Sequence, residues 1–114
     1  MNHFVIEEIE PKALAEGVVI RMVSGEKLSM VFYWIKPGSP IPEHSHPHEQ
    51  IGTVLKGKIE LSVGEDKRTV GPGEVYHIPS NVPHSGRCLE TESEVMEVFS
   101  PPREDFLALP GIKG

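Results

Sequence analysis

Residues 38–57 read GSPIPEHSHPHEQIGTVLKG and contain three histidines within five positions. His44 and His46 are separated by one residue, so in an extended segment both imidazoles face the same side. Gln50 follows at the start of a run that resembles a β-strand and ends in a Lys-Gly turn. Because several imidazoles that converge on one point commonly bind a divalent transition metal, the stretch predicts part of a metal site.

Further along the chain, His84 follows the turn-forming residues Asn-Val-Pro and is the fourth candidate ligand. The predicted ligands are therefore His44, His46, Gln50 and His84. The alternative is a solvated polar loop without a metal. The residue types suit one ion of Zn, Ni, Fe, Mn or Cu and do not select among them.

The remaining histidines are expected to lie outside the ligand set. His48 could face the same side as His46, and we expect it at the rim of the site rather than on the metal. No metal role is expected for His3 or His77. His77 shares a strand face with Val75, and it could point into the fold as a polar neighbour of the site.

Turn residues divide the chain into short segments, since 11 glycines and 11 prolines occur in 114 residues. Such punctuation favours many short strands over long helices and predicts an all-β sandwich or barrel. A helical turn is expected at 12–16, a proline-stiffened loop at 37–43 and a short helix at 103–109. The expected strands are 3–9 (a strand or an arm), 18–24, 28–35, 50–55, 58–63, 67–70, 74–78, 84–89 and 94–99.

Residues 28–35, LSMVFYWI, are apolar on both alternating faces. A strand of this kind needs cover on both sides. One face can pack inside the fold, and the other can pack across a symmetric interface. The sequence therefore predicts a homodimer.

Size and charge restrict the class of protein. A chain of 114 residues is expected to form a single domain, and a net charge of −6 without a basic run argues against a nucleic-acid partner. The N-terminal segment is acidic where a signal peptide is basic, and no stretch has the ~20 apolar residues of a membrane span. We expect a cytoplasmic protein that acts on a small molecule. The single cysteine, Cys88, excludes an intrachain disulfide.

The spacing of these residues resembles the two-part signature of the cupin superfamily. The matching residues are Gly38, His44, His46, Gln50 and Gly57 in the first part and Gly73, Pro79, Asn81 and His84 in the second. The resemblance implies a jelly-roll β-barrel (a double-stranded β-helix) with one metal inside and a metal-binding core at about 28–100 of a single cupin domain, 1–114.

The chain departs from the cupin pattern at three positions. Gln50 replaces the usual glutamate ligand, Asn81 replaces a glycine and Cys88 replaces an asparagine. Three neutral imidazoles and a neutral amide leave the charge of a divalent ion uncompensated. Such an ion should be a stronger Lewis acid than one with a carboxylate ligand.

The last predicted strand brings in a possible acid or base. In EVMEVF, the side chains of Val95, Glu97 and Phe99 share one face. Glu97 is either an edge residue that faces solvent or an inward carboxylate placed for proton transfer. Arg103 follows a rigid Pro-Pro and is either solvated or a fork-shaped donor for a substrate carboxylate.

A narrower resemblance concerns the same stretch. HSHPHEQIG, VLKGKIEL, IPSNVPH and VFSPPREDFL together resemble the small KdgF-type cupins of pectin and alginate degradation. This resemblance implies that Glu97 (an aspartate in that family), Phe99 and Arg103 carry the reaction. The implied reaction converts a cyclic 4,5-unsaturated uronate into its linear keto form. The alternatives are an iron-dependent dioxygenase and a non-catalytic module that binds or senses a sugar.

Overall fold

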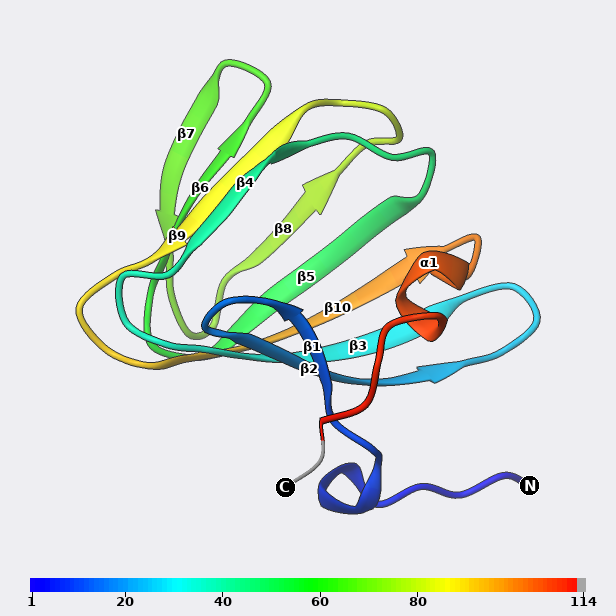
Figure 1. Ribbon diagram of the computed structural model, residues 1–114. Helices are drawn as coiled ribbons and strands as arrows, with labels where there is room; N and C mark the ends of the chain where they lie inside the picture. The colour runs from blue at the N-terminus through cyan, green and yellow to red at the C-terminus, as the bar shows by residue number, and fades with distance from the viewer. Residues whose placement is uncertain (113–114) are drawn as a thin grey trace.

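The computed structural model describes residues 1–112. Two antiparallel β-sheets face each other and splay apart at one end, as the jelly-roll prediction requires (Figure 1). Within the described chain the two sheets are not closed into one continuous barrel. The six-stranded sheet has the order β1 (Lys12–Ala15), β2 (Val18–Ser24), β3 (Ser29–Ile35), β10 (Ser93–Ser100), β5 (Glu49–Lys56) and β8 (Val75–Ile78). The four-stranded sheet has the order β4 (Pro40–His44), β9 (His84–Cys88), β6 (Ile59–Val63) and β7 (Asp66–Val70).

The core lies between the two sheets. Strands β2, β3 and β10 alternate regularly between buried and partly exposed residues, as strands with one face on a core do. On β3 the inward set is Val31, Tyr33 and Ile35, whereas Phe32 and Trp34 are partly exposed on the outer face. Both faces of the 28–35 stretch are therefore apolar, and residues 1–112 bury only one of them.

Of the two alternatives for residues 3–9, the arm is confirmed: this segment is exposed and contains a 3-10 helix, η1 (Ile6–Glu8), and no strand. Two local predictions were wrong. Residues 12–15 form strand β1 instead of part of a helical turn, because pairing with β2 along the sheet edge outweighs a weak local helical preference. The expected loop at 37–43 contains strand β4, whose prolines are tolerated because β4 lies at an edge and pairs only with β9.

Strand β10 lies in the interior of the six-stranded sheet, between β3 and β5. Its position rules out the interpretation of Glu97 as an edge residue. In the register of the sheet, Glu97 is opposite Gly52 of β5, and Gly52 is opposite Tyr76 of β8. These three residues therefore form one row across three neighbouring strands.

A short helix, α1 (Glu104–Leu107), follows β10 and lies beside the open end of the sandwich (Figure 1). The expected helix at 103–109 is thus confirmed in place but is shorter. Among residues 1–112, none of the helices has the length and apolar character needed to cross a membrane.

Candidate metal centre

Three histidines form a cluster between the sheets. The candidate ligand atoms of His44, His46 and His84 all lie within 4.8 Å of one another. His44 ends β4 and pairs directly with His84, the first residue of β9. His46 follows two residues after β4, so the His-x-His spacing and one strand pairing bring the rings together.

Each of the three rings is fixed by a hydrogen bond at Nδ1. The partners are backbone carbonyls two positions away: Pro42 for His44 at 2.8 Å, His48 for His46 at 2.9 Å and Val82 for His84 at 2.9 Å. An Nδ1–H that donates to a carbonyl leaves Nε2 with its lone pair, which is the tautomer found in metal-bound histidines. The Nε2 atoms of His46 and His84 are buried and have no hydrogen-bond partner in residues 1–112.

Gln50 contributes a further unpaired atom. Its Nε2 donates to Glu97 Oε2 at 2.8 Å, whereas its Oε1 is buried and lacks a hydrogen-bond partner within the described part of the chain. Buried polar atoms without partners are uncommon and costly in folded proteins. One divalent metal would satisfy these orphaned nitrogen and oxygen atoms together, so the cluster fits the group that the sequence predicts.

The surroundings of His46 and His84 keep these two imidazoles neutral. Burial lowers the pKa of His46 to about 4, and the positive charge of Arg103 adds to this effect. Burial also lowers the pKa of His84. At neutral pH both imidazoles are therefore unprotonated, which is the form that binds a metal.

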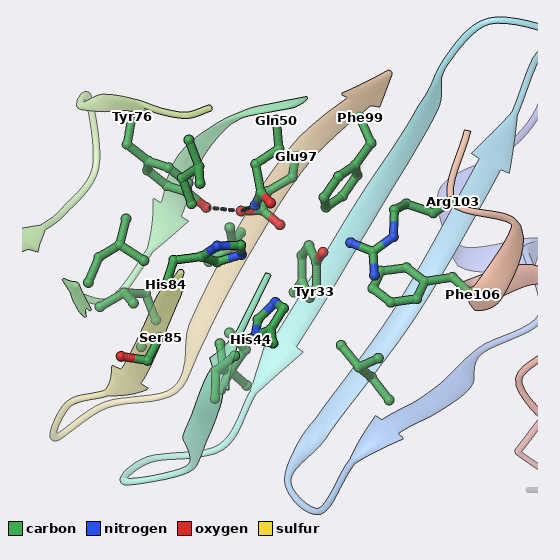
Figure 2. A pocket seen from close by; sticks show the side chains of 18 residues that line it. Tyr33, His44, Gln50, Tyr76, His84, Ser85, Glu97, Phe99, Arg103 and Phe106 are labelled. Atoms are coloured by element: carbon green, nitrogen blue, oxygen red, sulfur yellow. Dashed lines mark hydrogen bonds between the residues drawn. The ribbon is translucent and has the colours of Figure 1, made fainter. Parts of the chain in front are cut away.

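Glu97 points into the space beside the cluster, where its side chain is only 8% exposed (Figure 2). Its Oε2 accepts hydrogen bonds from Gln50 and from the Tyr76 hydroxyl, the latter at 2.5 Å. Tyr33 lines the same pocket as Glu97. Burial and the nearby Glu97 charge raise the pKa of both tyrosines well above 10, so the two hydroxyls stay protonated and act as donors.

Arg103 lies at the opposite wall of the same pocket and is 5% exposed, so the solvated alternative is wrong. Its guanidinium stacks 3.8 Å from the ring centroid of Phe106 and 4.7 Å from that of Phe99. Two of its nitrogens, Nε and Nη2, donate to the Asp105 carboxylate at 3.0 and 2.8 Å. The fork is thereby held in place, and Nη1 is the nitrogen not engaged by Asp105.

The other histidines have different surroundings. His48 lies outside the three-histidine group, with its ring 5.3 Å from that of His46, and its proposed rim role stays a prediction. The prediction that His77 points inward was wrong: His77 is exposed and contacts Glu49 at 2.8 Å on the outer face. The inner face of β8 carries Tyr76 and Ile78 instead.

The residues missed by sequence reasoning are the supporting ones: Tyr33, Tyr76, Asp105 and Phe106. A usable signal existed for two of them. Asp105 stands two residues after Arg103, within reach of a local ion pair, and Tyr76 alternates with the apolar Ile78 along β8.

Comparison with known proteins agrees with this geometry. The sequence pattern of the cupin domain matches residues 31–99, which is more than half of the chain. The chain belongs to the cupin family. As a cupin it is similar to the pectin degradation protein KdgF of Dickeya dadantii, with 30% identity over 93% of this chain and 98% of the relative.

Two other similar proteins bear on function. The structure of KdgF from Halomonas sp. superimposes with a TM-score of 0.86 and 28% identity over 92% of this chain and 97% of that one. H2HPP isomerase of Bacillus subtilis is 32% identical over 65% of this chain and 36% of its own length. The resemblance of this cupin to KdgF-type proteins is thus confirmed along nearly the whole chain.

Proposed function

We propose that this cupin is a metal-dependent enzyme that converts a cyclic 4,5-unsaturated uronate, derived from pectin or alginate, into its linear keto form. The observation that carries the proposal is one pocket with three kinds of group on its walls (Figure 2). These are two members of the three-histidine cluster (His44 and His84), a buried carboxylate at Glu97 and a buried guanidinium at Arg103. The likeness to KdgF supports the choice of substrate.

The proposed reaction is an isomerisation that needs no oxidant or reductant. The ring bond between C1 and the ring oxygen breaks, and the C1 hydroxyl loses its proton to become an aldehyde. The ring oxygen becomes the C5 ketone as the 4,5 double bond is lost and C4 gains a proton. One proton thus leaves an oxygen and one arrives at a carbon. A single acid/base group such as Glu97 can carry out both proton transfers.

The other residues bind and orient the substrate. Nη1 of Arg103 would donate to the substrate carboxylate, while Asp105 keeps the guanidinium in a fixed orientation. Phe99 packs between the His46 ring and the Arg103 guanidinium and keeps water away from the reacting atoms.

His44, His46, His84 and Gln50 would hold one divalent ion of Zn, Ni, Fe, Mn or Cu, and for His46, His84 and Gln50 the ion would bind the atom that now lacks a partner. Bound there, the ion supplies a Lewis acid for negative charge that develops on a substrate oxygen.

The test is incubation of metal-loaded protein with unsaturated galacturonate while the absorbance of its conjugated acid is followed. Turnover that falls at least ~100-fold in Glu97→Gln is expected, in line with the usual contribution of an acid/base group. No rate above background would overturn the proposal. Oxygen uptake that requires Fe(II) would favour a dioxygenase, and thermal stabilisation by the uronate without turnover would favour a binding module.

The outer face of the six-stranded sheet supports a homodimer as the working form. Met30, Phe32 and Trp34 of β3 are partly exposed there, and Ile51 and Leu55 of β5 are exposed. Five strands ~4.8 Å apart and ~20 Å long offer roughly 500 Å² in projection, which is somewhat over half of the ~800 Å² per partner of a stable interface. The exposed apolar arm at residues 4–6 adds to this area.

Light scattering tests the association directly. The wild-type chain should have twice the mass of one chain, and Phe32→Lys should shift it to a monomer with its fold intact. A wild-type monomer at ~100 µM would contradict the homodimer.

A further inference from the structure

The row of Tyr76, Gly52 and Glu97 across β8, β5 and β10 has an unusual arrangement at its centre. Glycine occupies the middle position, and the Tyr76 ring extends over it. The hydroxyl of Tyr76 thereby reaches Glu97 Oε2 on the strand beyond, at 2.5 Å (Figure 2). A side chain on β8 thus contacts one on β10 although β5 lies between them.

The absence of a side chain at Gly52 makes this contact possible. A Cβ atom at that position would lie 2.5 Å from both Cζ and the hydroxyl oxygen of Tyr76, and 2.8 Å from Cγ of Glu97. Carbon atoms in contact normally stay 3.5–4.0 Å apart. Gly52 does not have a left-handed backbone, so space and not conformation is what requires glycine here.

The contact bears on the proposed metal site as well as on the proposed base. Glu97 Oε2 accepts the Tyr76 hydroxyl and the amide of Gln50 together. Two donors on one oxygen fix the plane of the carboxylate and hence the direction of Oε1. The same carboxylate determines which end of the Gln50 amide faces Glu97, and it therefore leaves the buried Oε1 of Gln50 as the atom available to a metal.

We propose that Tyr76, seated over Gly52, is a positioning residue that aligns Glu97 for proton transfer and, through Glu97, aligns Gln50 toward the metal. Its kinetic part rests on the proposed function. Its metal-binding part does not, since alignment of Gln50 affects metal affinity whatever the substrate is. The hydroxyl stays protonated because burial and the Glu97 charge raise the pKa of Tyr76 well above 10.

The experiment compares Tyr76→Phe and Gly52→Ala in the metal-loaded protein. Val75→Ala is the matched control, because Val75 is the neighbouring β8 residue and points outward with 71% exposure. Turnover of the uronate gives kcat and KM, and competition with a chelator gives metal affinity. Thermal unfolding identifies variants that have lost the fold.

Tyr76→Phe removes one hydroxyl and keeps the ring, so it should fold normally. We expect kcat to fall ~10-fold or more with KM within ~2-fold, as for loss of a hydrogen bond to a charged group. Metal affinity should fall ~10-fold. Gly52→Ala should lower kcat and metal affinity at least as much, because its Cβ would displace both the Tyr76 ring and Cγ of Glu97.

An unchanged kcat and metal affinity in Tyr76→Phe would overturn the proposal. If the wild-type protein does not turn over the uronate, the proposed function fails and metal affinity decides the positioning role. A metal affinity in Tyr76→Phe equal to that of Val75→Ala would then overturn the positioning role of Tyr76. A ~10-fold loss of metal affinity would sustain that role.

Discussion

The hydrogen bond between Gln50 and Glu97 predicts the effect of restoring the glutamate that cupins usually carry at position 50. Gln50→Glu replaces the donor Nε2 with an oxygen, 2.8 Å from Glu97 Oε2. Both side chains are buried, at 4% and 8% exposure. In the metal-free protein the substitution therefore places two carboxyl groups in contact where one donor and one acceptor stood.

The size of the effect follows from two competing costs. Two full charges 2.8 Å apart repel by about 6 kcal/mol at an effective dielectric constant of ~20. Protonating one ordinary glutamate, with a pKa of ~4.3, costs about 3.7 kcal/mol at pH 7. Protonation is the cheaper route, so it limits the loss of stability to roughly 2–4 kcal/mol at pH 7.

The pH dependence of this loss has a definite sign. The folded variant binds one proton more than its unfolded chain, so its free energy of unfolding falls as pH rises between ~4.3 and 7. The slope relative to wild type should approach ~1.4 kcal/mol per pH unit. At pH 4.5 the variant and the wild type should therefore differ little.

Urea unfolding of chelator-treated protein at pH 4.5, 6 and 7 measures these quantities. The matched control combines Gln50→Glu with Glu97→Gln, which exchanges donor and acceptor and should recover more than half of the lost stability. A loss below ~1 kcal/mol at pH 7, or a loss of the same size at pH 4.5, would refute the reasoning.

Three further predictions concern the same pocket. His84→Ala should reduce bound metal to under a tenth of an ion per chain by elemental analysis, because it removes one of three clustered imidazoles. Asp105→Asn should raise KM about 10-fold with kcat within ~3-fold, because it loosens the Arg103 fork; an unchanged KM would argue against a clamp. The metal-free protein should lose stability as pH falls from 6.5 to 4, because unfolded His46 binds a proton that the folded protein excludes. Thermal unfolding should show a flatter profile in His46→Gln.

The parts of the site that were predictable from sequence are those with local spacing. His44 and His46 lie near the end of one strand, and the turn before His84 marks the start of another. Their pairing across β4 and β9 is long-range, and only the family pattern indicated it. The strand ranges followed from alternation and turn residues, with errors where an edge pairing outweighed local preference, as at β1.

The supporting residues could not be predicted because their roles depend on register and on strand order. In the stretch EVYHI, either alternate set could face the core, and sequence reasoning chose the set with His77. Pairing of β8 with β5 places Tyr76 over a glycine, where there is space for its ring. That space is a property of two strands together and leaves no signal in either one alone.

The departures from the family pattern compensate for one another. The glutamate that cupins usually carry at position 50 would contact Glu97, whereas the amide of Gln50 donates to Glu97 and keeps its own oxygen for the metal. Glu97 is one methylene longer than the aspartate of KdgF-type proteins, and Gly52 leaves room for its Cγ. The extra length therefore does not push the carboxylate out of the pocket, since Tyr76 and Gln50 both bind it on the inner face. A change at Gln50, Gly52 or Glu97 alone should therefore lower the free energy of unfolding more than a paired change does, if the pair preserves one donor, one acceptor and the space between them.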